Sequence, residues 1–391
     1  MFFAFNHERI YPVIPIPFAS EPSLPNPSGA EPSFLETIGW SSFFQNQLSS
    51  GETGIPGRVA SANHGRFLVW TDSGEVDSSV SGVLRKAGAL WPAVGDWVIL
   101  REGEAAIDRV LIRKTCVSRK QPEREVREQV LAANIDVLFI VSGLDRDYNP
   151  RRIERFLVMA NESGARPVVL LNKADLAQEL GLDLAGIVAG TQLLSPAIDV
   201  IPISALSDHG LDEVPVQLAR GETAALIGSS GVGKSTILNR LLGQDRQATT
   251  PVRSSDSRGR HTTTSRQLFL MPGGWLLMDL PGLREVQLWA TAAPITGTMD
   301  GNLEATFEDI QQLAQTCRFR DCTHTAEPGC AVTAAQLDPA RLANYQKMQR
   351  ELAHLDRKTD PRLAKETKSK WKAIEKSVRS HPKRGLNSGV D

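Results

Sequence analysis

Long apolar runs and cysteines are both scarce in this sequence of 391 residues. A helix that crosses a membrane needs about 20 consecutive apolar residues, and no such run is present, so we expect no membrane partner. The apolar start, residues 1–5, is short and has no basic lead, which argues against a secretory signal. The four cysteines, three of which lie within fourteen residues, favour a metal site over a disulfide framework. These absences predict a cytoplasmic protein, and we expect it to be a monomer.

An excess of charge of one sign is also absent, since 44 Lys and Arg stand against 45 Asp and Glu. A protein that binds nucleic acid over much of its surface is expected to be basic, so any such contact must be regional. Residues 350–391 hold twelve Lys and Arg against six Asp and Glu, a local net charge of +6. The last helix of this tail lies either along RNA or in solvent, and we favour RNA.

Changes of pattern along the chain divide it into four predicted parts. Residues 1–54 form an N-terminal extension that is disordered or partly helical, and seven prolines fall in its first 33 residues. Residues 55–119 show short β-type runs broken by turn residues, as expected for a small barrel. Residues 120–305 alternate apolar strands with helical stretches, which predicts a mostly parallel sheet with helices on both faces. Residues 306–391 are predicted to form a zinc-binding helical domain that ends in a basic helix.

The predicted barrel carries basic side chains that could bind the phosphates of a nucleic acid. We expect Trp70, Trp91 and Trp97 to belong to its core, because tryptophans in strands are usually buried. The basic residues are available either for phosphate contacts or simply for a solvated face. They are Arg58, Arg66, Arg85, Lys86, Arg113, Lys114, Arg119 and Lys120.

A glycine-rich segment, residues 228–235, lies between an apolar run typical of a buried strand and a run with helical spacing. Backbone N–H groups at such a turn point at phosphates, and the helix N-terminus adds a favourable dipole. Lys234 would reach the outer phosphates, and Ser235 would supply a hydroxyl to Mg²⁺. A glycine-rich turn without a ligand is the disfavoured alternative. The predicted phosphate-binding residues are Gly228, Ser229, Ser230, Gly231, Val232, Gly233, Lys234, Ser235 and Thr236.

Two segments upstream of this phosphate loop predict that the base is guanine. Asn172-Lys173-Ala174-Asp175 follows an apolar strand, and the carboxylate of Asp175 can accept from the ring N–H and the exocyclic amine of guanine together. Adenine offers no such donor pair, and an unpaired buried carboxylate is costly, so the wrong base is rejected. Ser204 and Ala205 follow the next strand, where a backbone N–H would meet the guanine oxygen. We assign Asn172 and Lys173 to the same site.

Two segments downstream are predicted to sense the terminal phosphate. The polar stretch 259–264 carries threonines that could coordinate Mg²⁺, and Thr262 and Thr263 are the candidates. Asp279 follows an apolar strand and would hold the metal through water, and the N–H of Gly282 would contact the terminal phosphate. The sequence leaves open which threonine binds the metal.

Leu283 stands where many GTPases have a glutamine that orients the attacking water. His261 is the nearest polar candidate for that catalytic role, and a merely solvated loop histidine is an equally weighted alternative. An enzyme without the glutamine should be slow alone and should depend on a partner. In other GTPases partners accelerate hydrolysis about 10³ to 10⁵ fold, which corresponds to about 4 to 7 kcal/mol of barrier.

A cluster of cysteine and histidine follows the nucleotide motifs, with the pattern Cys317-x₄-Cys322-x-His324-x₅-Cys330. Three thiolates and one imidazole make a closed tetrahedral set for Zn²⁺ and leave no position for a catalytic water. We therefore predict one structural zinc ion per chain, whose binding would contribute about 10 to 16 kcal/mol of apparent folding energy. Chance clustering of buried cysteines is the alternative. Cys116 lies far away and is expected in a core.

The order of the motifs is reversed relative to ordinary GTPases, because the guanine motif at 172–175 precedes the phosphate loop at 228–235. Such a chain is a circularly permuted GTPase. Together with the Cys/His cluster, this order resembles the ribosome small-subunit-dependent GTPase A family (RsgA, also called YjeQ or YloQ) over approximately residues 55–355.

The resemblance implies an OB-fold for the barrel and a GTPase that acts late in the assembly of the small ribosomal subunit. It also implies that this particle stimulates hydrolysis of GTP to GDP, so the expected partners are the subunit and its rRNA. Two other functions remain open from the residues alone. One is a nucleotide-controlled RNA-binding placeholder with negligible hydrolysis, and the other is a GTPase that delivers its metal.

Overall fold

The computed structural model describes residues 32–49, 51, 53–86, 90–120, 128–145, 147–195, 198–243, 266–280, 299–325 and 327–359. Within these ranges, no helix has both the length and the apolar character that crossing a membrane requires. Residues 1–31 of the predicted N-terminal extension and residues 360–391 of the predicted basic tail lie outside them.

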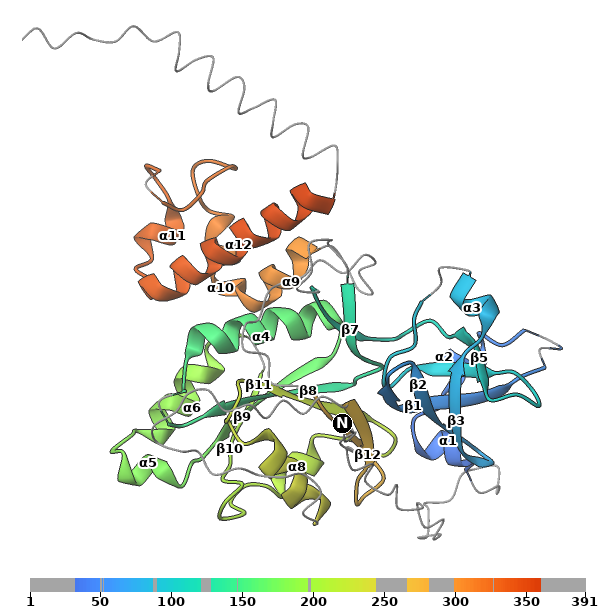
Figure 1. Ribbon diagram of the computed structural model, residues 1–391. Helices are drawn as coiled ribbons and strands as arrows, with labels where there is room; N and C mark the ends of the chain where they lie inside the picture. The colour runs from blue at the N-terminus through green and yellow to red at the C-terminus, as the bar shows by residue number, and fades with distance from the viewer. Residues whose placement is uncertain are drawn as a thin grey trace, which may run out of the picture. The chain divides into compact units, whose positions relative to one another are not determined.

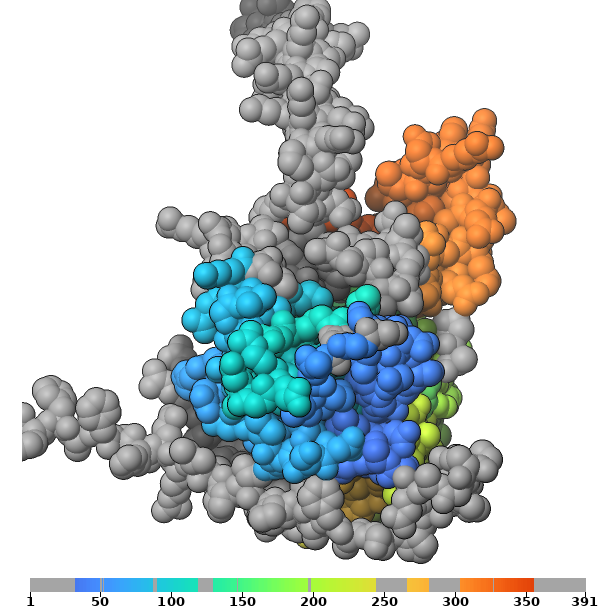
Figure 2. Space-filling view, turned by 90° about the vertical axis from the view of Figure 1, so that its right-hand side faces the viewer, coloured from blue at the N-terminus to red at the C-terminus, as the bar shows by residue number. Residues whose placement is uncertain are grey.

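A closed barrel follows two short helices at the start of the described chain (Figure 1). The helices are α1 (Phe34–Thr37) and α2 (Ser42–Gln45), and the strands run in the order β1-β2-β3-β5-β4, with β4 pairing back onto β1. The barrel prediction is confirmed, and Figure 2 shows its residues, coloured blue to cyan, gathered on one face. The strands are β1 (Ile55–Asn63), β2 (Arg66–Thr71), β3 (Gly74–Val80), β4 (Trp97–Leu100) and β5 (Ala106–Val110), with α3 (Gly82–Lys86) after β3.

The tryptophans of the barrel do not share one environment. Trp70 and Trp97 are buried as expected, and the Trp97 ring lies edge-on to Trp40, 4.9 Å between centroids. Trp91 is 52% exposed, so the prediction that it belongs to the core is wrong. It precedes β4 in an irregular segment, where the alternation that buries every second strand residue does not apply.

Two of the arginines that were candidates for phosphate contacts are instead buried structural groups. Arg58 is 2% exposed and its pKa falls to about 10, because burial disfavours the charged form more than Asp136 and Asp96 favour it. Its guanidinium joins the barrel to the nucleotide domain through Asn134 O and, at 2.7 Å, Thr223 Oγ1. Arg113 forms a buried ion pair with Asp96 at 2.7 Å. Neither can bind RNA without losing these partners.

The nucleotide domain is built on a sheet with the strand order β10-β9-β8-β11-β13-β12. All neighbouring pairs are parallel except β12 with β13. Figure 1 shows α4 (Pro150–Ser163) across one face and α8 (Lys234–Leu242) on the other, as predicted. The strands are β8 (Val137–Gly143), β9 (Arg166–Asn172), β10 (Asp199–Pro202), β11 (Thr223–Gly228), β12 (Arg266–Leu270) and β13 (Leu276–Asp279), and the short helices are α5 (Leu176–Glu179), α6 (Leu184–Gln192) and α7 (Glu213–Val216).

Helix α4 begins and ends where its sequence signals lie. The side chain of Asn149 accepts from the N–H groups of Arg151 and Arg152, and Gly164 ends the helix in the left-handed conformation at φ 80°. Asn149 and Gly164 are therefore the two caps of this helix. The helix is therefore fixed at its N-terminus, beside the carboxyl ends of β8 and β11, where ligands of open parallel sheets bind.

The barrel and the nucleotide domain share one continuous sheet. Ser61 and Ala62 of β1 pair antiparallel with Gln267 and Arg266 of β12, so backbone hydrogen bonds join the two parts. A hairpin of β6 (Cys116–Lys120) and β7 (Glu128–Ala133) also lies between them, and the boundary predicted between residues 119 and 120 falls inside β6.

The C-terminal module is helical and packs on α4. Phe307, Tyr345 and Met348 are buried in one cluster with Val158 of α4. Buried polar contacts reinforce this packing, since Glu154 accepts from Arg341 at 2.8 Å and from Asn344. The helices are α9 (Met299–Thr306), α10 (Glu308–Ala314), α11 (Ala331–Ala334) and α12 (Pro339–Thr359).

Candidate nucleotide site and metal centre

The phosphate loop leaves the end of β11 and enters α8, at the centre of the sheet. Gly233 precedes the helix with φ 99°, and a Cβ there would lie 2.3 Å from the side-chain amide nitrogen, Nδ2, of Asn172. A Cβ at Gly228 would lie 2.3 Å from the carbonyl oxygen of Val141. These two glycines are required by the close approach of the loop to β9 and β8 as well as by backbone conformation.

Lys234 is buried at the base of the loop. Its ammonium group donates to the carbonyl oxygens of Gly228 and Ser229 at 2.9 and 2.8 Å. Burial lowers the pKa of Lys234, and the negative charges of Asp279 and Asp147 act against that shift. The ammonium group of Lys234 is thus held inside the loop that is predicted to surround the phosphates. Two carboxylates, those of Asp279 and Asp147, lie near enough to interact with its charge.

Asn172 connects the guanine motif with both neighbouring loops. Its amide nitrogen donates to Val232 O of the phosphate loop at 2.8 Å, and its amide oxygen accepts from the N–H of Ala205 at 3.1 Å. The side chain is buried, so each of these bonds replaces water. Sequence reasoning assigned Asn172 to the site without a role; in the structure it holds three predicted segments together.

Lys173 extends from the same motif onto the phosphate loop. Its ammonium group donates to Asp145 Oδ2 at 2.5 Å and to Gly231 O at 3.0 Å. The φ angle of Lys173 is 66°, in the left-handed region, which turns the chain sharply after β9. Burial acts to raise the pKa of Asp145, but the bond from Lys173, the charge of that residue and bonds from backbone N–H groups together outweigh it, so the pKa is lowered.

Asp175 and Ser204 meet at the other end of the site, where the hydroxyl of Ser204 donates to Asp175 Oδ1 at 2.5 Å. Asp175 itself is exposed, which differs from the buried carboxylate that the specificity argument assumed. It sits at the start of the short helix α5, beyond the end of the strand, and therefore faces solvent. A bound base would itself have to cover the Asp175 carboxylate, because only a buried carboxylate penalises a base such as adenine that leaves it unpaired.

Asp279 ends β13 as a buried residue and pairs in register with Leu226 of β11. Its charge acts on Lys234, which places the predicted metal-holding carboxylate beside the phosphate loop. The catalytic candidate His261, the threonines Thr262 and Thr263, and Gly282 lie outside the described residues.

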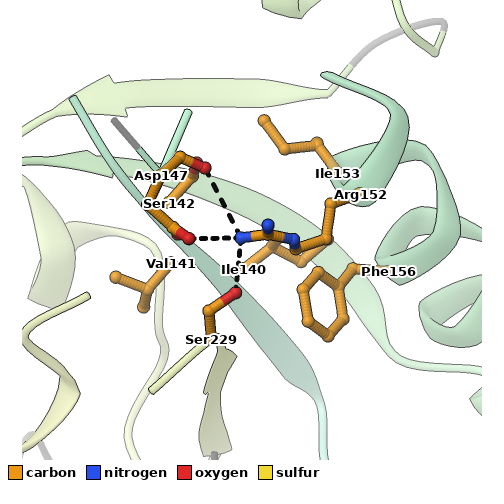
Figure 3. Close-up of a pocket in the computed structure, with 8 residues that line it drawn as sticks. All are labelled: Ile140, Val141, Ser142, Asp147, Arg152, Ile153, Phe156 and Ser229. Atoms are coloured by element: carbon orange, nitrogen blue, oxygen red, sulfur yellow. Dashed lines mark hydrogen bonds and ion pairs between the residues drawn. The ribbon is translucent and has the colours of Figure 1, made fainter. Parts of the chain in front are cut away.

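Sequence reasoning missed a group of residues that supports the loop from α4. Figure 3 shows Arg152 reaching from the helix to Asp147 and Ser229, in a small pocket that Phe156 and Ile153 also line. Asp145 and Asp147 follow β8, whose carboxyl end adjoins that of β11. Two aspartates between an apolar strand and a helix cap were the available signal.

The four predicted metal ligands are brought together within the C-terminal module, with all ligand atoms within 4.8 Å of one another. His324 Nδ1 lies 3.7 Å from Cys317 Sγ and 3.6 Å from Cys330 Sγ, and these two sulfurs are 4.0 Å apart. Tetrahedral zinc with Zn–S bonds of about 2.3 Å has edges of about 3.5 to 3.8 Å, so the set, completed by Cys322, fits that ion.

Other side chains orient this cluster. Cys330 caps α11, where its sulfur accepts from the N–H and the hydroxyl of Thr333. Burial acts to raise the pKa of Cys330, but these bonds and His324 outweigh it and lower the pKa to about 6. Glu327 accepts from the N–H groups of Thr323 and Thr325, which fixes the turn that carries His324. The lowered pKa favours the thiolate form of Cys330, the form that binds metal, whereas burial raises the pKa of Cys322.

Comparison with known proteins decides the family. The RsgA GTPase family model matches residues 110–289, and a model for 50S ribosome-binding GTPases matches residues 223–362, which begin at β11. The small ribosomal subunit biogenesis GTPase RsgA of Opitutus terrae is 42% identical over 367 residues, covering 88% of this chain and 97% of that protein. The chain belongs to the RsgA GTPase family. The predicted family and enzyme class are thus confirmed.

Solved structures of RsgA relatives agree in fold. YjeQ from Thermotoga maritima matches with a TM-score of 0.54 and 26% identity, over 77% of this chain and 99% of that one. YloQ, a circularly permuted GTPase, matches with a TM-score of 0.51 and 21% identity, over 78% of this chain and 97% of that one. The predicted architecture of barrel, permuted GTPase domain and C-terminal Cys/His module is confirmed.

Proposed function

We propose that this GTPase acts in the biogenesis of the small ribosomal subunit and hydrolyses GTP faster when bound to that particle. The observation that carries the proposal is the 42% identity, over 88% of the chain, to a relative named for this process. The barrel of residues 55–119 and the C-terminal module of residues 306–391 would contact rRNA, on either side of the GTPase domain of residues 120–305. The protein would work as a cytoplasmic monomer.

We propose that the nucleotide lies along the carboxyl ends of β9, β8 and β11. The base would bind at Asp175, Ser204 and Ala205, and its phosphates would lie in the loop of residues 228–236. Lys234 would exchange its two loop carbonyls for phosphate oxygens, which keeps its charge paired throughout binding. Ser235, Asp279 and the threonine stretch would hold Mg²⁺, which prefers oxygen ligands.

The water-positioning role of His261 is part of this proposal. A neutral imidazole within hydrogen-bond reach of water can orient it for attack in line with the leaving group. The N–H of Gly282 would contact the same terminal phosphate. A partner that orders residues around 261 and 282 would then raise kcat more than it changes the affinity for GTP.

The metal centre would hold one zinc ion per chain in a structural role. Its four ligands leave no position for a substrate, and Glu327 and Thr333 fix their orientation. The ion would keep the segment 317–330 folded as an RNA-contacting surface rather than transfer to another protein.

The deciding experiment measures phosphate release from GTP with and without purified small ribosomal subunits. We expect an acceleration within the range of about 10³ to 10⁵ fold that activated GTPases show. Large subunits, added at the same concentration, are the control. Equal rates in all three conditions would contradict the proposal. The same assay on His261→Ala separates the roles: lost stimulation supports His261, and retained stimulation removes it while leaving the enzyme assignment intact.

A further inference from the structure

The phosphate loop is held from two flanks, and the known motifs account for one of them. On one flank Lys173, of the guanine motif, donates to Gly231 O at 3.0 Å. On the other flank Arg152, the third residue of α4, donates to Ser229 Oγ at 2.6 Å. Arg152 belongs to none of the nucleotide motifs, yet it contacts the loop as directly as Lys173 does.

Each of the two cations is paired with an aspartate of the loop that follows β8. Lys173 binds Asp145 Oδ2 at 2.5 Å, and Arg152 binds Asp147 Oδ1 at 2.5 Å. The two pairs are joined, because Asp145 Oδ1 accepts from the N–H of Asp147 at 2.9 Å. Figure 3 shows the Arg152 end of this series of linked contacts, with the guanidinium between Asp147 and Ser229.

Asp147 poses an electrostatic problem for a phosphate-binding loop. Its charge acts on Lys234, the residue predicted to bind the outer phosphates, so it lies near enough to act on the phosphates too. The side chains of Asp147 and Arg152 are 27% and 35% exposed, which leaves them partly shielded from water. An uncompensated carboxylate in that position would repel a polyphosphate over several ångströms.

We propose that Arg152 is a positioning residue for the nucleotide: it fixes Ser229 through the hydroxyl group and neutralises Asp147 beside the phosphate loop. The proposal rests on the proposed guanine-nucleotide site. Binding of GTP or GDP therefore depends on a cation supplied by α4, in addition to Lys234. Arg152 touches the loop and not the reacting atoms, so it affects nucleotide affinity and KM more than kcat.

The first test compares Arg152→Ala with Arg152→Lys in titrations with a fluorescent GDP analogue. Loss of one charge-assisted hydrogen bond and exposure of Asp147 should raise Kd about tenfold in Arg152→Ala. Arg152→Lys keeps the charge and should recover most of the affinity. With small subunits present, KM for GTP should rise similarly in Arg152→Ala while kcat stays within about twofold of wild type.

The neighbouring arginine supplies the matched control. Arg151 lies in the same helical turn but pairs with Glu154 at 2.5 Å and with Asp338 of the C-terminal module at 2.9 Å. Arg151→Ala removes an equal charge from α4 without touching the loop, and its Kd for the GDP analogue should equal that of wild type. Thermal unfolding of each variant reports any general loss of folding.

The double variant Asp147→Asn/Arg152→Ala separates neutralisation from mere packing. If Asp147 repels phosphate when unpaired, removing its charge should tighten binding about threefold relative to Arg152→Ala. Added KCl should also reduce the difference in Kd between Arg152→Ala and wild type, because salt screens the repulsion between Asp147 and the phosphates. The neutralising role would be refuted if the double variant bound no better than Arg152→Ala and if the difference in Kd between Arg152→Ala and wild type did not depend on salt.

The outcomes also distinguish this proposal from the function on which it rests. A wild-type protein that binds no guanine nucleotide would remove the proposed function. A wild-type protein that binds GDP while Arg152→Ala binds equally well would overturn only the assignment of Arg152. A Kd raised to the same extent in Arg151→Ala and Arg152→Ala would mean that α4 is simply destabilised, which also overturns it.

Discussion

The nucleotide site and the metal centre both concentrate charge, but they are assembled in opposite ways. The proposed metal ligands come from one segment of fourteen residues, 317–330, and a single ion would connect them all. The nucleotide site draws on the ends of several strands, and separate pairs such as Lys173–Asp145 and Arg152–Asp147 compensate its charges. Loss of one ligand side chain should therefore abolish metal binding entirely. Loss of one side chain from the nucleotide site should remove only that contact and lower the affinity for nucleotide by a limited amount.

The largest effect is expected at the metal centre. Cys317→Ser should abolish stoichiometric zinc and unfold the segment around it, since metal binding in such modules contributes about 10 kcal/mol or more. Metal content by mass spectrometry and hydrogen exchange of residues 299–359 provide the measurement. Cys116→Ser, at a buried cysteine outside the cluster, is the control and should retain zinc. One bound zinc per chain in Cys317→Ser would show that the cluster is not the site.

Lys234→Ala should give the largest effect in the nucleotide site. Loss of the buried ammonium removes about 3 to 4 kcal/mol of interaction with phosphates, which is several hundredfold in affinity for GTP. Fold and zinc content should remain, as checked by circular dichroism and metal analysis. Lys347→Ala, on the exposed surface of α12, serves as the control. Wild-type affinity in Lys234→Ala would place the phosphates elsewhere.

Asp175→Asn tests the guanine end of the site and should cost about 2 to 3 kcal/mol of GTP affinity. Inosine triphosphate, which lacks the exocyclic amine, supplies an internal comparison. Wild type should bind GTP more tightly than ITP, and the difference should disappear in Asp175→Asn because the second acceptor is gone. If Asp175→Asn still prefers GTP to ITP by the wild-type factor, another residue reads the amine.

Glu162 of α4 sharpens the comparison because, in the part of the chain that the structure describes, its charge is compensated neither by a metal ion nor by an ion pair with a cationic side chain. Burial raises the pKa of Glu162 to about 8, and Oε1 has no hydrogen-bond partner among the described residues. The folded-state pKa exceeds the unfolded value, so its contribution to stability is complete below about pH 4.5 and is lost as pH rises toward 8. Glu162→Gln should raise stability by about 1 to 2 kcal/mol at pH 8 and change it little at pH 4.5. Equal shifts in Tm at both pH values would contradict this assignment.

The same contrast explains what could be predicted from the sequence. The proposed metal ligands lie close along the chain, and their spacing alone predicted the cluster that the structure assembles. The nucleotide motifs were likewise recognisable because each is a short segment at a strand end. Arg152 and Asp147 were not, since their role depends on β8 and β11 being neighbours in the sheet, and residues 147 and 229 are far apart in sequence.

The barrel shows a second limit of sequence reasoning. Arg58 and Arg113 are chemically indistinguishable from arginines that bind phosphate, and only the fold reveals that they are buried between carbonyl, hydroxyl and carboxylate groups. Trp91 was misplaced for the converse reason, because an irregular segment near a strand gives its side chain no buried face. Composition gives residue types, but their exposure is decided by packing.

The pairing of Ser61 and Ala62 with β12 has a mechanical consequence. A barrel attached only by a linker could turn freely while the nucleotide domain kept its shape. Here backbone hydrogen bonds carry any displacement of β1 directly into β12, and from there into β13, which ends in Asp279. Traction on the barrel would therefore be felt at the carboxyl end of β13, where Asp279 lies.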